Sequence, residues 1–418
     1  MSIQQYRNSH LHIENVALRD IAQDLGTPCY VYSRKAIEDS YLAYRNALDS
    51  DGENKHLVCY AVKANSNLAV LNILAKLGSG FDIVSLGELE RVIAAGGSAE
   101  KIVFSGVAKS SADIRHALEV GIHCFNVESE TELARIAEVA KSMQVKAPIS
   151  LRVNPDVDAK THPYIATGLA ENKFGVDIEE APRIYIEASN DPHLNVIGVD
   201  CHIGSQLTEL APFEDALQRV LTLVDSLASH NITLKHIDIG GGLGVTYQDE
   251  LPPSIESYIK MLLSKLGPRQ INLVMEPGRS IVANAGFLIS KVDTIKSNPV
   301  KNFAIVDVAM NDMLRPALYN AWMQALPLSL ESEEPLTTYD IVGPVCETGD
   351  FLAKERILAI AEGDYICLNS AGAYGFVMSS NYNSRPRAAE VMVDKSNYHI
   401  VRERESMADL IRGERLLP

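Results

Sequence analysis

The sequence predicts an α/β fold, in which a (β/α)8 barrel is joined to a second β-rich domain. Three observations lead to this prediction. Short β-rich segments alternate with helical patterns from residue 56 onward, which is typical of a parallel sheet. Eight such strands precede residue 277, and eight is the number of strands in a closed barrel. Beyond that point strands follow one another with few helices between them. An open doubly wound sheet is the alternative for the first part.

The predicted barrel strands are short apolar segments that lead into polar residues or glycines. They cover residues 56–62, 80–85, 101–105, 123–127, 148–154, 196–202, 234–240 and 272–276. The segments between them carry apolar residues at helical spacing. The predicted helices cover residues 67–77, 86–95, 112–120, 130–142, 177–189, 212–230 and 255–266, and a long polar loop precedes the helix at 177–189.

The rest of the chain predicts a separate β-rich domain. Its expected strands cover residues 281–295, 303–308, 339–345, 357–360, 364–368 and 390–393. The N-terminal segment is expected to join them, because Leu11–Glu14 is itself strand-like. We therefore expect the barrel to span residues 28–284 and the β-rich domain to combine residues 1–27 with residues 285–418.

Composition and charge exclude several classes of function. The 418 residues allow two domains with large cores, and a chain with 46% hydrophobic and 22% charged residues is typical of globular proteins. The formal net charge of −16 offers no basic stripe for phosphates, so no nucleic-acid partner is expected. We expect no signal segment and no membrane span. Six scattered cysteines without a C-x-x-C pair predict reduced residues in a cytoplasmic protein.

Lys63 follows the first barrel strand directly, in the segment Tyr60–Asn65. That position places its ammonium group at the mouth of the fold rather than on a wet helix face. Burial lowers the pKa of a lysine, and the neutral amine attacks carbonyl groups, as Schiff-base chemistry requires. The alternative is a lysine that caps the sheet or pairs with a carboxylate.

Other polar residues also stand at the ends of predicted strands. Catalytic groups of (β/α)8 barrels lie at the carboxyl ends of the strands, so these side chains should converge on one rim. In chain order they are Lys63, Asp82 with Ser85, Ser105, Asn126 with Glu128, Arg152 with Asn154, His202, Gly240–Gly242 and Glu276.

The segment Gly240–Gly244 follows the seventh strand and begins with three successive glycines. It lacks the G-x-G-x-x-G spacing of dinucleotide-binding loops. Glycines let backbone N–H groups close on an anion, and the loops after the seventh and eighth strands of such barrels often bind phosphate. The last of these loops, Glu276–Arg279, adds another glycine and a guanidinium group. A plain tight turn is the alternative explanation for the glycines.

A phosphate site, a Schiff-base lysine and a carboxylate together indicate pyridoxal phosphate as the cofactor. Glu276 is suited to keep the pyridine nitrogen protonated, because a carboxylate favours the charged form of a neighbouring base. The protonated ring then withdraws electrons from a carbanion at the substrate's Cα. His202 is placed to stack on the ring face. No metal is expected at this site.

These motifs resemble the fold-type III pyridoxal-phosphate-dependent decarboxylases, which have an alanine-racemase-like fold. The resemblance rests on Tyr60–Asn65, His202–Ser205, Gly240–Gly242 and Glu276–Arg279. Three further motifs extend it to the diaminopimelate decarboxylase family, over about residues 30–387. They are Arg315–Tyr319, Val345–Asp350 and Gly372–Gly375.

The resemblance implies a role for each barrel residue. Lys63 would form the Schiff base with the cofactor, Asp82 would support it, and His202 would stack on the ring. The ring and the phosphate would be held by Lys63, Asp82, His202, Ser205, Gly240, Gly241, Gly242, Glu276, Pro277, Gly278, Arg279 and Tyr374.

The resemblance also implies an activity, the decarboxylation of meso-2,6-diaminopimelate to L-lysine and CO2 as the last step of lysine biosynthesis. Cys346 would protonate Cα, which makes Lys63, His202 and Cys346 the catalytic residues. The distal end of the substrate would be bound by Arg279, Arg315, Tyr319, Glu347 and Tyr374. In this family Cys346 and Glu347 would come from the partner subunit, so a homodimer with shared sites is implied.

The charges of the residues expected to bind the distal end agree with that substrate. Arginines suit bidentate recognition of a carboxylate, and Glu347 matches an ammonium group. A surface charge pair is the alternative for Arg315 and Glu347.

Three other functions are alternatives for a chain with these motifs: a decarboxylase for ornithine, arginine or lysine, an alanine racemase, and a non-catalytic carrier of pyridoxal phosphate. The segment Arg315–Tyr319 suits a substrate carboxylate, which ornithine and lysine lack at the distal end.

Overall fold

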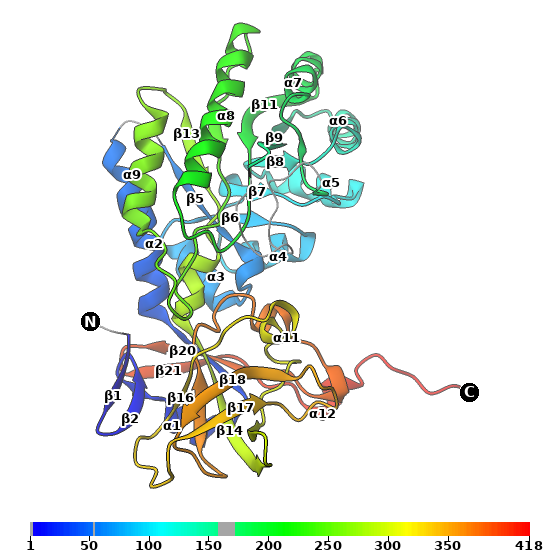
Figure 1. Ribbon diagram of the computed structural model, residues 1–418. Coiled ribbons are helices and arrows are strands. Elements are labelled where there is room, and N and C mark those ends of the chain that lie inside the picture. Colours follow the sequence, from blue (N-terminus) through cyan, green and yellow to red (C-terminus); the bar gives the residue numbers. More distant parts are fainter. Residues whose placement is uncertain (1–2, 53–54, 158–171) are drawn as a thin grey trace. The chain divides into compact units, whose positions relative to one another are not determined.

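A computed structural model describes residues 3–52, 55–157 and 172–418 of the protein (Figure 1). The chain divides into two compact units. The first combines residues 40–245 with 251–280 and holds the predicted barrel strands. The second combines residues 1–39, 246–250 and 281–418. Much of the polar loop predicted before residue 177 lies outside the described residues.

Eight parallel strands form the barrel of the first unit. In order they are β5 (Leu57–Ala61), β6 (Gly80–Ile83), β7 (Ile102–Phe104), β8 (Cys124–Val127), β9 (Ala147–Asn154), β11 (Leu194–Asp200), β12 (His236–Asp238) and β13 (Asn272–Met275). β5 pairs with both β6 and β13, and β9 pairs with both β8 and β11, so the sheet closes on itself. The predicted barrel is confirmed, and the open doubly wound sheet is wrong.

The predicted helices between the strands are present. They are α3 (Leu68–Lys76), α4 (Leu86–Ala94), α5 (Ser111–Val120), α6 (Glu130–Met143), α7 (Ala181–Asn190), α8 (Ala211–Ser229) and α9 (Ile255–Leu266). The helix predicted at 177–189 begins later, because β10 (Val176–Asp177) pairs with β9 and Pro182 favours the first turn of a helix. Helix α2 (Arg34–Leu48), which precedes β5, was not predicted.

Serine residues fix where several barrel helices begin. The hydroxyl groups of Ser85, Ser110, Ser129 and Ser254 each accept a hydrogen bond from a backbone N–H of the following first turn. Such an N-cap stabilises a helix by about 1 kcal/mol, because it satisfies a donor that the helix leaves open. Ser85 follows β6 by two residues, so the cap fixes a short strand-to-helix loop at the carboxyl end of that strand.

A mixed sheet forms the core of the second unit. Its main order is β18 (Phe351–Leu358), β17 (Thr337–Val342), β15 (Asn302–Val306), β14 (Gly286–Ser297), β4 (Cys29–Ser33), β20 (Ala389–Asp394) and β21 (Asn397–Arg402). β19 (Tyr365–Leu368) pairs with β14 and with β16 (Ala325–Pro327). The predicted β-rich domain is therefore confirmed. The strand predicted at 281–295 begins at Gly286, because 279–285 form short helical turns.

The N-terminal segment belongs to this second unit. A small antiparallel sheet combines β1 (Gln4–Arg7), β2 (His10–Ile13) and β3 (Val16–Ala17). Leu11 and Ile13 share an apolar core with Val31, Ile289 and Val391. β4 lies inside the predicted barrel range 28–284, and the structure pairs it with β14 and β20 in the mixed sheet.

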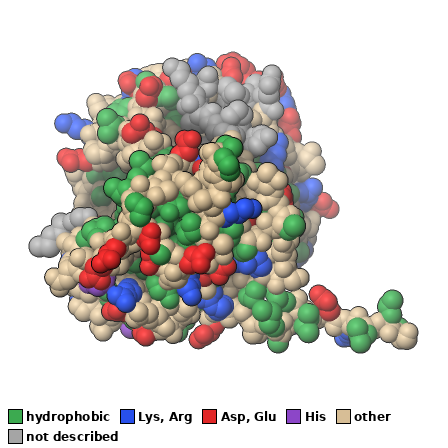
Figure 2. Space-filling view, turned by 60° about the horizontal axis from the view of Figure 1, so that its bottom comes forward, with side chains coloured by type: hydrophobic (Ala, Val, Ile, Leu, Met, Phe, Trp, Pro, Cys, Tyr) green, Lys and Arg blue, Asp and Glu red, His purple; other side chains and the backbone are tan. Residues whose placement is uncertain are grey.

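The C-terminal end of the chain forms an extended tail (Figure 2). Leu416 and Leu417 in this tail are almost fully exposed. Among the described helices, none combines the length and the apolar character that a bilayer crossing requires.

All six cysteines are free thiols. Five of them are buried, as predicted, and Cys346 is exposed.

Candidate active site

Lys63 and Asp82 form an ion pair at the carboxyl ends of two neighbouring strands. Lys63 lies in the single turn that follows β5, and its Nζ is 2.5 Å from Oδ2 of Asp82 in β6. The Asp82 side chain is fully buried, whereas that of Lys63 is 38% exposed. Oδ1 of Asp82 is buried without a hydrogen-bond partner among the described residues. The lysine side chain is thus partly exposed and one carboxylate oxygen of Asp82 has no partner among the described residues, as expected where a ligand completes the site.

Glu276 follows β13 and is held by a hydrogen-bond network inside the barrel. The Asn126 amide on β8 donates to Oε1 of Glu276 at 3.3 Å and to Oδ2 of Asp238 at 3.4 Å. Ser105, just after β7, donates to the same Glu276 oxygen at 3.3 Å. These contacts orient one Glu276 oxygen and bring together three of the strand ends that the sequence singled out.

Three buried carboxyl groups meet in this layer of the barrel. Atoms of Asp200, Asp238 and Glu276 lie within 4.8 Å of one another. Burial raises the pKa of Glu276 to about 7, with a further contribution from Asp82, and it raises the pKa values of Asp200 and Asp238 well above their usual range. Burial therefore favours the protonated form of these carboxyl groups, and a positive group beside Glu276 would favour its ionised form.

Sequence analysis did not propose Asp200 and Asp238 as site residues. Each lies two residues before a predicted strand-end residue, Asp200 before His202 and Asp238 before Gly240. Side chains two apart on a strand point to the same side, so this spacing was the available signal. Arg152 in β9 balances part of the charge: Nη1 is 3.0 Å from Oε1 of Glu128, and Nε is 3.9 Å from Oδ2 of Asp200.

His202 follows β11 and lies against the triple glycine. Its Nδ1 accepts a hydrogen bond from the Gly241 N–H at 3.3 Å. A Cβ atom at Gly240 would lie 2.6 Å from that nitrogen, and the φ of +65° at this position also favours glycine. Burial lowers the pKa of His202 well below its usual value, and Arg152 and Lys63 add to the shift. The imidazole is therefore neutral, which suits packing against an aromatic ring.

The glycine loop approaches neighbouring backbone as closely as glycine allows. A Cβ at Gly241 would lie 2.3 Å from the carbonyl oxygen of Glu276, so the two loops predicted to bind phosphate are in contact. Gly240 donates its N–H to Oδ1 of Asp238 at 2.9 Å, so this N–H is already used in a hydrogen bond within the protein. Arg279 donates to the Ser205 hydroxyl at 3.2 and 3.0 Å, which brings a third predicted segment to this place.

The predicted residues of the second unit lie on three segments. Arg315 and Tyr319 bound α11 (Arg315–Tyr319). The Arg315 side chain is buried, stacks on Tyr247 at 4.5 Å from the ring centroid, and donates to the Ser370 carbonyl at 3.3 Å. Tyr374 has a φ of +55° within the segment Gly372–Gly375. Arg315 is therefore a buried, oriented cation rather than a residue of a surface charge pair.

Cys346 and Glu347 occupy a loop between β17 and β18. Both are exposed, and the Cys346 N–H donates to Oδ1 of Asn383 at 3.2 Å. The Tyr382 hydroxyl donates to Oε2 of Glu347 at 2.8 Å. The buried Asp350 carboxylate fixes the loop by accepting from the N–H of Val345 at 2.9 Å. Tyr382 and Asn383 carry no motif that marked them in the sequence.

The chain is similar to known proteins in both sequence and fold. A family model described as "Pyridoxal-dependent decarboxylase, pyridoxal binding domain" matches residues 34–283. A crystal structure of diaminopimelate decarboxylase from Helicobacter pylori, complexed with L-lysine, has a TM-score of 0.90 at 43% identity and covers 94% of this chain and 98% of its own. Its counterpart from M. jannaschii, also with L-lysine, has a TM-score of 0.95 at 37% identity, covering 99% and 98%.

The family model and these similar structures place the chain among the pyridoxal phosphate-dependent decarboxylases. Diaminopimelate decarboxylase from Pseudomonas aeruginosa is 61% identical over 413 residues, which is 99% of either chain. The chain belongs to the diaminopimelate decarboxylase family.

Proposed function

We propose that this chain catalyses the pyridoxal phosphate-dependent decarboxylation of meso-2,6-diaminopimelate to L-lysine and CO2, the last step of lysine biosynthesis. One observation carries the proposal: Lys63, Asp82 and Glu276 lie at strand ends of one barrel, in a chain that matches diaminopimelate decarboxylases over nearly its whole length. The bound L-lysine named for two similar structures is the product that this reaction would yield.

The residues present fit pyridoxal phosphate. The cofactor, when bound, supplies an aldehyde for amines and a protonated ring that stabilises negative charge at Cα. Lys63 offers the amine, and Asp82 holds that amine in place. Glu276 is oriented to accept a hydrogen bond from the ring nitrogen, and the neutral His202 offers a flat face to the ring. Ser205, Gly240–Gly242, Pro277–Arg279 and Tyr374 form the proposed cradle for the phosphate and the ring.

The charged residues of the second unit would recognise the far end of the substrate. Arg315 presents a guanidinium that is already stacked on Tyr247, so little side-chain freedom is lost when it binds a carboxylate. Arg279, Tyr319 and Tyr374 would add contacts to this carboxylate, and Glu347 would bind the distal ammonium. The Cys346 thiol would give its proton to Cα after CO2 leaves.

We also propose a homodimer in which each site combines barrel residues of one subunit with the partner subunit's Cys346 and the partner subunit's Glu347. The exposure of both residues supports this arrangement, because a donor to another chain has to lie at the surface. The six free cysteines support a reducing compartment, the cytoplasm.

Borohydride reduction of the enzyme loaded with pyridoxal phosphate should attach the cofactor permanently to Lys63. The loaded enzyme should first absorb above roughly 400 nm, as amine-bound pyridoxal phosphate does, and peptide mapping then locates the label. Lys109 is the internal control, because it also pairs with a carboxylate, Glu132, at 2.6 Å but is buried. A label on Lys109, or on any lysine except Lys63, would refute the assignment of the site.

Mixing two inactive variants should restore activity if the sites are shared. Lys63→Ala and Cys346→Ala homodimers should each be poor enzymes. A mixed dimer contains one site with both native residues, so equal mixing should recover about a quarter of the wild-type activity. The control mixes Lys63→Ala with Glu276→Gln, two changes in the same unit, and should recover none. Sites built within one chain predict no recovery in either mixture.

A further inference from the structure

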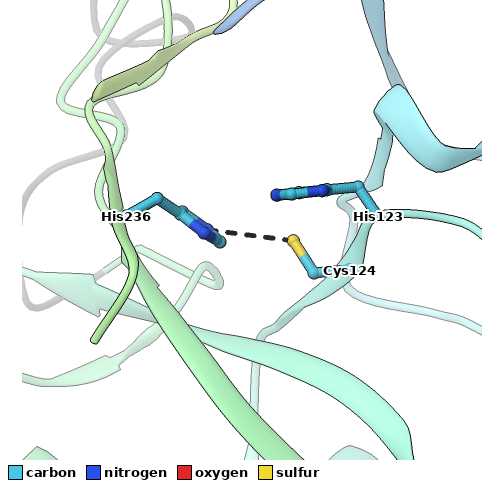
Figure 3. Close-up of side chains that lie close together, drawn as sticks. All are labelled: His123, Cys124 and His236. Atoms are coloured by element: carbon cyan, nitrogen blue, oxygen red, sulfur yellow. Dashed lines mark hydrogen bonds between the residues drawn. The ribbon is translucent and has the colours of Figure 1, made fainter. Parts of the chain in front are cut away.

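A second group of polar side chains lies at the amino-terminal end of the barrel strands, away from the rim described above. Cys124 is the first residue of β8, His123 precedes it, and His236 is the first residue of β12. The two imidazole rings come from opposite sides and point toward a common gap, with the Cys124 sulfur at its edge (Figure 3). Two imidazoles and one thiol are the ligand types that zinc and related transition metals prefer.

The distances in this cluster are close to those of a metal centre. One potential ligand atom from each residue lies within 4.8 Å of the other two, and Sγ of Cys124 is 3.9 Å from Nε2 of His236. In a tetrahedral zinc site, with bonds of about 2.0 Å to nitrogen and 2.3 Å to sulfur, ligand atoms lie roughly 3.3–3.8 Å apart. The largest of these separations would therefore have to shrink by up to about 1.5 Å around an ion.

The backbone around the cluster makes room for these rings. Gly198 in β11 is the register partner of His236, and a Cβ there would lie 2.1 Å from Nε2. The backbone of Glu100 adjoins His123 and favours the protonated ring, which limits the lowering of its pKa by burial. Such an outer contact is common for histidines that bind metals. Cys124 and His236 are buried, whereas His123 is half-buried and offers a route from solvent.

We propose that His123, Cys124 and His236 form a binding site for a zinc-like transition-metal dication, with water as the fourth ligand. Magnesium and calcium are not expected there, because they prefer oxygen ligands. The site is separate from the cofactor residues, although Cys124 also lies 3.8 Å from Oδ1 of Asn126, in the layer above.

The charge states of the three groups are compatible with this role. Burial lowers the pKa of His236 to about 3 and also lowers that of His123, so both rings keep lone pairs for an ion. Burial raises the pKa of the Cys124 thiol, and Asp238, Asp200 and Glu276 raise it further. The thiol is therefore protonated without an ion and would release that proton to solvent as the metal–sulfur bond forms. When ionised, the same carboxyl groups would favour a dication, whereas Lys235 opposes it.

The test measures uptake of Co²⁺ and Zn²⁺ by the purified holoenzyme after removal of bound metals with a chelator. We expect one Co²⁺ per chain, with visible absorption of a tetrahedral cobalt centre at longer wavelength than the cofactor. X-ray absorption should give one sulfur at about 2.3 Å and two imidazoles. Calorimetry with Zn²⁺ should show binding at least ~10-fold weaker for His123→Gln and Cys124→Ser, since even loss of an outer contact costs that much.

Matched variants separate this site from adventitious binding. Cys367→Ser removes another buried thiol, and His193→Gln removes another partly exposed histidine of the barrel unit; both should bind as the wild type does. His123→Gln changes a half-buried ring and should fold even if the Cys124 variant does not. The proposal is overturned if no stoichiometric uptake occurs, if His123→Gln binds as tightly as wild type, or if the cobalt shell contains no sulfur. The cluster would then be a buried thiol–imidazole contact only.

Discussion

Replacing Glu276 with glutamine should lower kcat for meso-diaminopimelate by at least ~100-fold while pyridoxal phosphate stays bound, the scale of a lost charge-stabilising contact. Glutamine retains an oxygen that can accept the hydrogen bonds from Asn126 and Ser105, so the network should survive. What it loses is the negative charge that we propose keeps the ring nitrogen protonated. Steady-state kinetics and the cofactor's absorption spectrum check both parts.

Glu88→Gln is the matched control for this change. Burial also raises the pKa of Glu88 to about 7, but its carboxylate accepts from the Val84 N–H rather than from the Asn126 network. It should turn over at close to the wild-type rate. Near-normal turnover of Glu276→Gln would show instead that Glu276 does not act on the ring nitrogen.

The burial of Glu276 also predicts a pH dependence of stability in the cofactor-free enzyme. Burial raises the pKa of Glu276 from 4.5 to about 7, so between these values the folded chain binds more protons than the unfolded chain. Its contribution to the free energy of unfolding therefore falls as pH rises through that range. Denaturant titrations should show Glu276→Gln gaining stability relative to wild type from pH 5 to pH 7. A constant difference would contradict the assigned burial effect.

Arg315→Ala should reduce kcat/KM for meso-diaminopimelate by roughly 30- to 1,000-fold, about 2–4 kcal/mol. The loss should fall mainly on KM, because a charge-assisted bidentate contact disappears and the distal carboxylate is left unpaired. Weak activity on lysine or ornithine should fall much less, since neither carries a distal carboxylate. Product analysis with all three substrates measures this difference.

Loss of packing needs its own control, because Arg315 is buried against Tyr247. Arg356→Ala removes another stacked arginine of the same unit, whose guanidinium lies 4.3 Å from the Trp322 ring centroid and donates to the Met323 carbonyl. We expect it to lower stability without changing the preference among substrates. Equal losses of Arg315→Ala on all three substrates would assign Arg315 a structural role.

The barrel and its rim could be predicted because their signals are local. Each barrel strand is a short apolar segment, and strand order in a closed barrel follows chain order, so Lys63 and Glu276 could be assigned to one rim without knowing any contact. Helix α2 was missed although its buried residues Ala36, Ile37, Tyr41, Tyr44 and Leu48 repeat at helical spacing. That spacing predicts a helix, but α2 lies before the first barrel strand and so outside the strand–helix alternation that begins at residue 56.

Other features depend on long-range partners that no local pattern specifies. The segment Cys29–Ser33 is apolar enough for any buried strand, and only its pairing with β14 and β20 assigns it to the mixed sheet. Asp200 and Asp238 look like ordinary strand residues until the barrel closes and brings both carboxyl groups beside Glu276. Tyr382 likewise meets Glu347 across 35 residues of chain.

Closure of the barrel by β5 and β13 has a consequence for how the enzyme matures. Ala61 in β5 donates its N–H to the carbonyl of Pro277 at 3.2 Å, so the first and last barrel strands are joined beside Lys63 and Glu276. These residues are far apart in the chain, and loop closure over such a span is slow and comes late in folding. A growing polypeptide that has not yet reached Glu276 lacks the segment Glu276–Arg279, which is proposed to hold the cofactor. Pyridoxal phosphate would thus bind and stabilise only the finished barrel, and it would not direct the folding of the incomplete chain.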